Sequence, residues 1–371
     1  MTLPLAGYTV GVTAARRADE LGALLERRGA TVIHGPAIRI VPLADDADLS
    51  HATRSLLTDP ADVVVATTGI GFRGWMEAAE GWGLGDDLRA ALSTTTLLTR
   101  GPKAKGAVRA AGLVERWAPE SESNAEVLEY LLDSGVAGRR IAVQLHGEPL
   151  REFVDTLRGA GASVLEIPVY RWTTPADPAP LERLLDVVLA GGVDALTFTS
   201  APAAASLLAA AGRRGKAEAL VESLRCKVLT GCVGPITAGP LTRVGVPVVQ
   251  PERARIGALV RELVVALPAR ALRVRAGQSE LELRGQAVLV DGDLRPVPPA
   301  PMAVLRALAE SPGTTLPRPV LGAVLRRHSG RTDAVDEHAV ETTVGRLRSA
   351  LGAAGLVQTV VKRGYRLAPS T

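Results

Sequence analysis

The feature that most constrains the fold of this 371-residue chain is an internal repeat. Asp62–Thr68 resembles Asp194–Ser200, since each is an apolar run that ends in small hydroxyl residues before a helical pattern. Further along, Thr96–Pro102 resembles Val228–Pro235, where a second short strand runs into a Gly-Pro pair. From the aspartate to the glycine before that proline, the spacing is 39 residues in the first copy and 40 in the second. Matching order at matching spacing predicts two similar halves.

The first 268 residues alternate between strand and helix patterns. Tyr8–Thr13 predicts a strand, Asp19–Arg28 a helix and Thr31–His34 the next strand. This alternation predicts parallel sheets with helices on both faces, with cores of Ala, Val and Leu because aromatic residues make up only 3% of the chain. Ligands of open α/β sheets bind at the carboxyl ends of the strands, so the candidate ligand sites are the turns after Thr13, Thr68, Ser200 and Gly234.

Several classes of protein are excluded by simple features. The two cysteines, Cys226 and Cys232, are separated by an apolar run that, as a strand, would hold them roughly 20 Å apart, too far for a disulfide. No zinc-type Cys/His spacing occurs, and we expect no metal and no cofactor. The start of the chain does not resemble a signal peptide, and the longest uncharged stretch, 195–212, contains a proline and several hydroxyl residues. We therefore expect a cytoplasmic protein with no membrane contact.

The stretch Gly69-Ile70-Gly71-Phe72-Arg73-Gly74 has the GxGxxG spacing of a dinucleotide-binding turn. That function requires a second strand with an acidic residue about 20 residues on. Here a mostly helical pattern follows over 77–92, interrupted by Gly81-Trp82-Gly83. We therefore interpret the glycines as a turn that lets a ligand or another part of the backbone approach closely.

Positive charge is concentrated at one end of the chain. Residues 271–371 hold 14 Lys and Arg against 9 Asp and Glu, a net charge of +5, whereas the preceding 270 residues hold 29 against 30. A basic terminal domain on a neutral body indicates a polyanionic partner at that end, although a basic surface without a partner is the alternative.

The last hundred residues show the order of elements of a winged helix. Residues 269–277 are Arg-rich without an apolar period, and we interpret them as a linker before a domain over 278–371. Short strands are predicted at 281–283, 287–290 and 294–297, helices at 302–310, 318–327 and 337–351, and a closing hairpin at 357–361 and 365–367. This order predicts a winged helix-turn-helix fold.

The third helix, 337–351, has an apolar stripe at Val340, Val344, Leu347 and Leu351. The other face carries Thr342 and Arg346, and a basic hairpin with Lys362 and Arg363 follows. An arginine can pair with guanine in the major groove while basic wing residues contact phosphate or the minor groove. The alternative is an amphipathic helix with an ordinary solvated face.

The same region resembles the OmpR/PhoB-type effector domain over residues 278–368. The resemblance rests on Ala334–Glu341, Arg346-Leu347-Arg348, Val357–Val360 and the closing Arg363–Leu367. It implies promoter DNA and RNA polymerase as partners, with the 328–335 loop facing the polymerase, and a homodimer on DNA. The DNA-binding positions that it implies are Thr342, Thr343, Arg346, Arg348, Thr359, Lys362 and Arg363. The receiver domain usual in such regulators is missing.

The body, over about 1–268, resembles uroporphyrinogen-III synthase. The resemblance is carried by Gly138–Gly147, Leu157–Ala162, Val169–Arg171, Asp194–Leu208 and Gly234–Ala238. It implies an α/β fold of two parallel-sheet lobes joined by two strands: a discontinuous lobe 1 (1–41 and 172–268) and a lobe 2 (42–171). That family closes hydroxymethylbilane with inversion of one pyrrole ring and needs no cofactor.

The same resemblance places a catalytic tyrosine at Tyr170, for which packing of an aromatic ring between the lobes is the alternative. Residues that would contact a tetrapyrrole-type ligand are Thr13, Arg16, Thr68, Gly69, His146, Gly147, Ser200, Gly234 and Thr237. Departures from the family pattern fall at three of these turns: Ala14-Ala15-Arg16, Thr68–Gly71 and His146–Pro149. For His146 a structural role is the favoured interpretation, with acid-base chemistry as the alternative.

The fusion of this body to this effector domain resembles the actinobacterial regulators associated with nitrate and nitrite assimilation, and this resemblance implies a transcriptional regulator of that process. The synthase-like body would sense a ligand or bind a partner such as a second regulator. The alternative is an active synthase that carries a DNA-binding tail.

Overall fold

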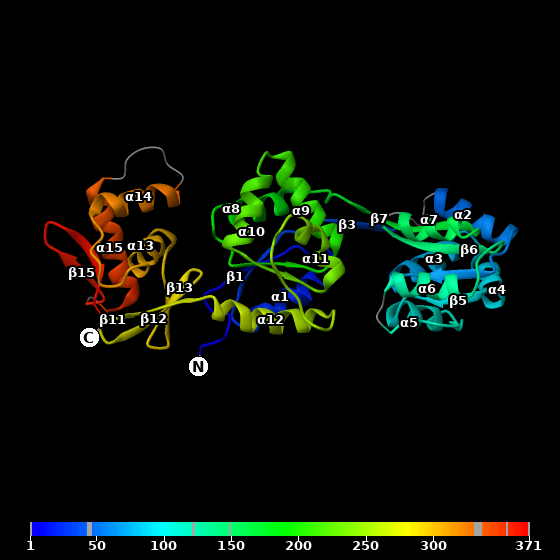
Figure 1. Cartoon of the computed structure of the whole chain (residues 1–371), viewed down its shortest axis with the longest axis horizontal. Helices are drawn as coiled ribbons and strands as arrows, with labels where there is room; N and C mark the ends of the chain where they lie inside the picture. The colour runs from blue at the N-terminus through cyan, green and yellow to red at the C-terminus, as the bar shows by residue number, and fades with distance from the viewer. Residues whose placement is uncertain are drawn as a thin grey trace. The chain divides into compact units, whose positions relative to one another are not determined.

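The computed structural model describes residues 2–42, 47–120, 123–147, 150–329, 336–353 and 355–369. Its contacts divide the chain into two compact units, Met1–Ile38 with Thr174–Thr371, and Arg39–Thr173 (Figure 1). The second unit is called lobe 2 below. In the first unit, lobe 1 denotes residues 2–38 and 174–269, and the winged-helix domain denotes 272–369. The lobe bounds expected from the sequence were 1–41 with 172–268, and 42–171.

Lobe 1 is built on a parallel sheet with strand order β10-β9-β8-β1-β2. Its strands are β1 (Thr9–Val12), β2 (Thr31–His34), β8 (Ala195–Phe198), β9 (Leu229–Cys232) and β10 (Val248–Val249). Its helices are α1 (Ala18–Glu26), α8 (Ala179–Leu189), α9 (Ala201–Arg213), α10 (Ala217–Cys226), α11 (Pro235–Arg243) and α12 (Ile256–Ala269). Val10 and Val12 pack with α1 and α12, whereas Gly11 faces Leu184 of α8, so helices cover both faces of the sheet.

Lobe 2 has a second five-stranded sheet, of order β3-β7-β6-β4-β5, in which only β3 is antiparallel. Its strands are β3 (Arg39–Pro42), β4 (Val63–Ala66), β5 (Thr96–Thr99), β6 (Arg140–Gly147) and β7 (Ser163–Thr173). Its helices are α2 (Ala47–Thr58), α3 (Gly69–Gly81), α4 (Gly85–Thr94), α5 (Pro102–Ala110), α6 (Asn124–Asp133) and α7 (Arg151–Gly159). Strand residues alternate between two cores, one around Phe72 and Trp75 and one around Val127 and Phe153.

The repeat seen in the sequence is a repeat in the structure. The run β4-α3-α4-β5-α5 in lobe 2 has the same order as β8-α9-α10-β9-α11 in lobe 1. The aspartate before each copy has the same role: Asp62 Oδ2 accepts the N–H of Arg140 at 2.8 Å, and Asp194 Oδ2 accepts the N–H of Thr9 at 2.7 Å. Each aspartate thus ties the start of its strand to the neighbouring strand.

The GxGxxG stretch forms the first turns of α3 rather than a loop. A Cβ on Gly69 would lie 2.2 Å from the carbonyl oxygen of Lys103, and one on Gly71 would lie 2.2 Å from the side chain of Gln144. The glycines therefore allow other parts of lobe 2 to approach α3 closely. Of the two expectations, a ligand or another part of the chain, the structure shows the second.

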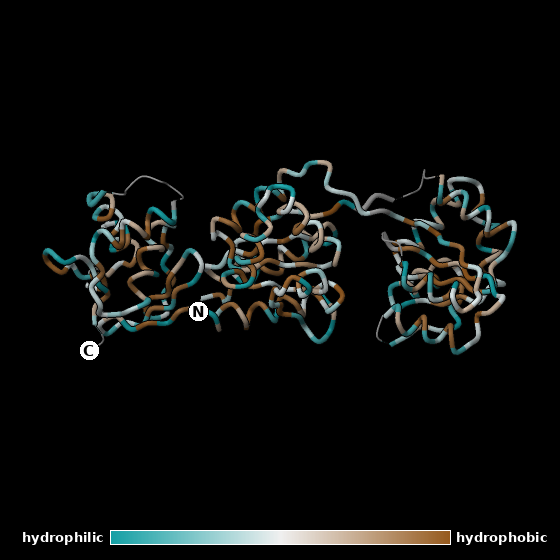
Figure 2. Tube along the Cα trace, turned by 45° about the horizontal axis from the view of Figure 1, so that its top comes forward, coloured by the Kyte–Doolittle hydropathy of each residue, from teal (hydrophilic) through white to brown (hydrophobic). Residues whose placement is uncertain are grey.

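The winged-helix domain begins with an antiparallel sheet of β11 (Leu272–Ala276), β12 (Ser279–Arg284), β13 (Ala287–Val290) and β14 (Asp293–Pro296). It continues with α13 (Pro299–Ala309), α14 (Arg318–Ser329), α15 (Glu337–Leu351) and the hairpin of β15 (Val357–Val360) and β16 (Gly364–Leu367). A single core joins the sheet to the three helices, and it includes Leu281, Leu305 and Leu347. Figure 2 shows hydrophobic residues along the central strands of each part.

The linker expected over 269–277 is wrong for most of its length. Residues 272–276 form β11, which pairs with β12 from Leu272 to Ala276. The linker interpretation weighed the arginines and overlooked an alternation. Apolar and charged residues alternate here as in a strand, with Leu272, Val274 and Ala276 separated by Arg273 and Arg275. Consequently only Arg270 and Ala271 separate the last helix of lobe 1 from the winged-helix domain.

Among the described residues, no helix is both long and apolar enough to cross a membrane. Two stretches from the sequence analysis, Glu148-Pro149 and 330–335, lie outside the described residues.

Candidate DNA-binding surface and ligand site

The helix α15 exposes one face to solvent, while its opposite face packs into the core of the winged-helix domain. Val340, Val344, Leu347 and Leu351 are buried, as the apolar stripe predicted. The helix begins at Asp336, whose side chain accepts the N–H of Ala339 at 2.7 Å, and it ends at Gly352 with a φ of 68°. Both ends are thus fixed by local chemistry.

Two of the predicted reading residues, Thr342 and Arg346, are exposed on α15. Two others are bonded within the domain. The hydroxyl of Thr343 donates to the carbonyl of Ala339 at 2.8 Å. Arg348 donates to the carbonyl of Val357 at 2.9 Å and to the hydroxyl of Thr359 at 2.8 Å, so it ties the helix to the wing. Its guanidinium therefore positions the wing against α15.

The wing is the turn between β15 and β16. Thr359, Lys362 and Arg363 are exposed there, and Val361 at the tip is 79% exposed. Lys362 has a φ of 58°, and the N–H of Arg363 closes the turn on the carbonyl of Val360 at 2.9 Å. A tight turn with two exposed cations suits contact with phosphate or a narrow groove.

One contributor to this surface was missed by the sequence analysis. Tyr365 is buried between two guanidinium groups, with Arg318 at 5.4 Å and Arg348 at 5.8 Å from its ring centroid. Arg318 also pairs with Glu341 at 3.2 Å, which offsets the charge of an anionic side chain on α15. The tyrosine is visible in the closing Gly-Tyr-Arg-Leu sequence, but its contact with Arg318 depends on the tertiary fold, which brings α14 to the hairpin.

In lobe 1, the adjacent strands β9, β8 and β1 bring three predicted ligand residues together at their carboxyl ends. We call this side of a sheet, where the parallel strands end, its edge. Thr13 is buried, and its hydroxyl donates to the carbonyl of Thr197 at 2.7 Å. Ser200 precedes α9 with no side-chain capping bond, and Thr237 is buried in the first turn of α11, just after Gly234. Arg16 is exposed beyond the same strand ends. The edge thus combines hydroxyls, helix N-termini and a cation, which suits carboxylates.

In lobe 2, the corresponding edge carries the Thr68 cap and the side chain of Gln144, whose Oε1 is buried without a protein partner among the described residues. Thr68 caps α3 by accepting the N–H of Gly71 at 3.2 Å. The buried amide of Gln144 donates to the Thr68 hydroxyl at 2.8 Å and to the Thr68 carbonyl at 3.2 Å. Gln144 was missed because a glutamine in a strand matches no motif. The amide occupies the space beside Gly71, whereas Gly69 faces the backbone of Lys103.

Tyr170 lies in β7 and is buried in the core of lobe 2, with its ring 6.3 Å from that of Trp172. The catalytic role suggested by resemblance stays a prediction. His146 and Gly147 lie at the end of β6, where its pairing with β7 is irregular between Leu145 and Gly147.

The chain matches two known families. Residues 19–261 match the family model of uroporphyrinogen-III synthase HemD. The chain belongs to the uroporphyrinogen-III synthase family. Residues 295–367 match the C-terminal domain of transcriptional regulatory proteins, so this synthase-family chain carries an OmpR/PhoB-type DNA-binding domain. The expected fold, two α/β lobes and a winged helix, is thereby confirmed.

Several proteins are similar to the synthase-family body. "Uncharacterized protein YjjA" of Bacillus subtilis is 29% identical over 260 residues, which span 70% of this chain and 96% of that protein. A putative uroporphyrinogen-III synthase of Methanothermobacter thermautotrophicus is 32% identical over 167 residues, which span 45% of this chain and 65% of that protein. A crystal structure of a mutant uroporphyrinogen III synthase from Thermus thermophilus, 30% identical, covers 68% of this chain and 96% of that one with a TM-score of 0.57.

Proposed function

We propose that this chain is a transcriptional regulator that reads promoter DNA through α15 and its wing, while its synthase-family body binds a tetrapyrrole-type ligand. The observation that carries the proposal is the reading face itself: Thr342 and Arg346 are exposed on a helix whose ends and opposite face are fixed, beside an exposed cationic wing. Such a surface meets the two needs of DNA recognition, base contact and backbone contact.

The test is a selection of bound sequences from a random DNA duplex pool, followed by fluorescence anisotropy on the selected duplex. Arg346→Ala should cost roughly 1–3 kcal/mol, or about ten- to hundredfold in Kd, and relax the preference at one base pair. Lys362→Ala should weaken all duplexes alike and reduce the salt dependence by about one ion. Arg213→Ala, an equal change of charge at an exposed position of α9, should change neither. A selected sequence preference that survives Arg346→Ala would refute the reading role.

The ligand proposal is supported by the edge of lobe 1. The N-termini of α9 and α11 meet there beside Thr13 and the exposed Arg16. Helix N-termini and a cation bind carboxylate groups, and a tetrapyrrole precursor is a polycarboxylate.

The biological subject that we propose is nitrate and nitrite assimilation. The support is chemical: assimilatory nitrite reduction uses sirohaem, which is made from uroporphyrinogen III, so a body of this family could report on that supply. We further propose that the protein acts in the cytoplasm as a homodimer on DNA, with RNA polymerase and a second regulator as further partners. Loss of nitrite-dependent transcription in a deletion strain, restored by the intact chain, is the expected result.

An active synthase is the second candidate, favoured by 30% identity to the Thermus enzyme across the body. The test is to supply freshly prepared hydroxymethylbilane and to measure the fraction of type III isomer, because spontaneous closure yields type I. A large type III fraction that falls with Tyr170→Phe would make the chain an enzyme with a DNA-binding tail. Product of type I alone would leave the body as a binding module.

A further inference from the structure

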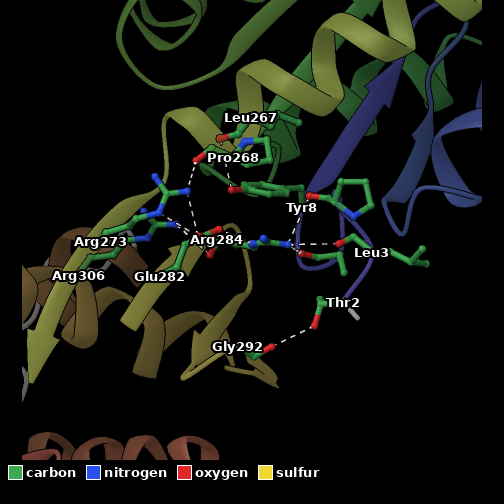
Figure 3. A network of polar contacts seen from close by, with 12 residues as sticks. Thr2, Leu3, Tyr8, Leu267, Pro268, Arg273, Glu282, Arg284, Gly292 and Arg306 are labelled. Carbon is green, nitrogen blue, oxygen red and sulfur yellow. Dashed lines mark hydrogen bonds and ion pairs between the residues drawn. The ribbon is translucent and has the colours of Figure 1, made fainter. Parts of the chain in front are cut away.

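The first residues of lobe 1 are joined to the winged-helix domain by a network of polar contacts around Arg284 (Figure 3). We call residues 2–8 the strap. The carbonyl of Gly7 accepts the N–H of Gln286 at 3.0 Å, and the hydroxyl of Thr2 donates to the carbonyl of Gly292 at 3.1 Å. The strap therefore contacts two turns of the winged-helix sheet, β12–β13 through the Gly7 carbonyl and β13–β14 through the Thr2 hydroxyl.

Arg284, at the end of β12, is the centre of this contact. Its side chain is 7% exposed, and its Nη1 donates to the carbonyls of Ala6 at 3.0 Å and of Leu3 and Pro4 at 3.4 Å. Its guanidinium also lies 5.5 Å from the ring centroid of Tyr8. Three carbonyls from one short segment thus converge on a single buried cation.

The buried charge of Arg284 is balanced within the same network. Its Nε donates to Glu282 at 2.8 Å, and Glu282 also pairs with Arg273 of β11 at 2.9 Å. Arg273 in turn donates to the carbonyl of Pro268 in α12 at 3.0 Å, so the network returns to lobe 1. A buried cation is tolerated only when it is paired in this way, and removing one partner is costly.

A second contact closes the other side of the β12–β13 turn. Asp194, which ties β8 to β1 in lobe 1, lies so close to Gly285 that a Cβ there would be 2.0 Å from its Oδ2. Arg306 of α13 donates to the carbonyl of Gly285 at 3.2 Å and attracts Asp194. Burial raises the pKa of the Asp194 carboxyl, as expected for a group enclosed between two domains.

We infer that the strap and Arg284 fix the winged-helix domain to lobe 1 as a single body, in an orientation that leaves the DNA-reading surface free. We call the contacts made by the strap, Arg284 and Gly285 the dock. The dock lies at the amino ends of β1 and β8, at Thr9 and Asp194, whereas the candidate ligand residues lie at the carboxyl ends. Neither α15 nor the wing takes part in the dock, and Arg346 and Lys362 stay exposed. Docking is therefore compatible with DNA binding and does not inhibit it.

The intact chain allows the first test, by hydrogen exchange at the amide of Gln286. Arg284→Met keeps the length of the side chain and removes the three carbonyl contacts, and should speed this exchange at least about tenfold. Arg295→Met is the matched control, because Arg295 is an exposed cation of the same sheet whose partner Asp293 is 3.7 Å away. Gly285→Ala should open the dock without removing a charge, because its methyl group would meet Asp194.

The second test uses a protease site placed between Arg270 and Ala271, the one chain crossing between lobe 1 and the winged-helix domain. After cleavage, the two fragments should elute together from a sizing column, and they should separate in the Arg284→Met and Gly285→Ala proteins. All variants should bind a selected DNA duplex within about twofold of the starting protein. Separation of the unsubstituted fragments would overturn the dock, and a tenfold gain in DNA affinity on undocking would show that the contact inhibits.

Discussion

The two lobes share one architecture, but the polar side chains at the carboxyl ends of their strands form different hydrogen bonds. In lobe 2, the helix after β4 is capped by Thr68, which is in turn held by Gln144. In lobe 1, Ser200 takes the place of Thr68 and caps nothing, and Thr13 takes the place of Gln144, with its hydroxyl directed to Thr197. The register makes these positions equivalent, since Val63 pairs with Ile141 and Ala195 pairs with Val10.

This difference indicates which lobe can hold a ligand through its own sheet edge. At the lobe 2 edge, the Gln144 amide N–H and the Thr68 groups are hydrogen-bonded to each other, whereas Gln144 Oε1 and Thr99 Oγ1 are buried without a protein partner in the part of the chain that the structure describes. At the lobe 1 edge the α9 N-terminus has no side-chain cap, so its N–H groups can be bound by a carboxylate. We therefore expect substitutions at the lobe 2 edge to change stability and those at the lobe 1 edge to change binding.

The largest effect on stability should come from Gly69→Ala. Its methyl group would lie 2.2 Å from the Lys103 carbonyl oxygen and 2.8 Å from the carbonyl carbon, and backbone cannot give way easily. We expect a loss of roughly 3 kcal/mol in the free energy of unfolding, measured by urea denaturation. Gly74→Ala in the same helix meets nothing within 4 Å and should be neutral or stabilise by about 0.5–1 kcal/mol. Equal effects of the two changes would contradict the close packing of α3.

Gln144→Ala should cost roughly 1–2 kcal/mol, because it removes two partly buried hydrogen bonds that hold the Thr68 hydroxyl and carbonyl at the start of α3. The loss should appear as faster hydrogen exchange in α3, with α9 of lobe 1 as the internal reference. A variant that exchanges at the same rate in α3 would show that Gln144 is dispensable for that helix.

A direct comparison of the lobes is given by Thr68→Ala and Ser200→Ala. Removal of the Thr68 cap should cost about 1 kcal/mol, whereas Ser200→Ala should cost no more than a few tenths. Both are measured as shifts of the denaturation midpoint. A loss at Ser200 as large as that at Thr68 would mean that the two edges are alike after all.

The smallest effect concerns the loops that follow α5 and α11. The guanidinium of Arg109 and the amine of Lys105 lower the pKa of Glu115 to about 2, whereas in lobe 1 Arg225 donates to the carbonyls of Val244 and Gly245. A lowered pKa adds stability above the unfolded value near 4.5, and that stability is lost as the pH falls toward 2. Glu115→Gln should cost less than about 1 kcal/mol at pH 7, since its partners are exposed, and flatten the pH dependence between about 5 and 2. As a control, an Arg225→Gln protein should keep the pH dependence of stability. If a Glu115→Gln protein also kept it, the ion pair of Glu115 would not be its cause.

Patterns that are local in the sequence predicted most of the fold. The apolar stripe of α15, the strand-turn-helix repeat and the closing hairpin each depend on residues close together in the chain, and each is present. The strand β11 was missed because its alternate residues are arginines, which composition alone assigns to a linker.

The parts of the site that could not be predicted depend on contacts distant in sequence. Gln144 acts on Thr68, 76 residues earlier, and Arg284 contacts Ala6, 278 residues earlier. Arg348 shows a related limit: the family resemblance implies that it contacts DNA, but only the fold shows that it holds the wing through Val357 and Thr359. Side-chain type fixes what a group can bond, and the tertiary fold chooses the partner.

The pairing of β3 with β7 has a practical consequence for taking the protein apart. Arg39 and Thr173 are register partners, so the chain enters and leaves lobe 2 at neighbouring points about 5 Å apart. The 135 residues between the two ends form a compact unit of their own. Lobe 2 should therefore be removable as a unit. A tight turn joining Ile38 to Thr174 should yield a chain of lobe 1 and the winged-helix domain alone, and the excised segment should fold by itself.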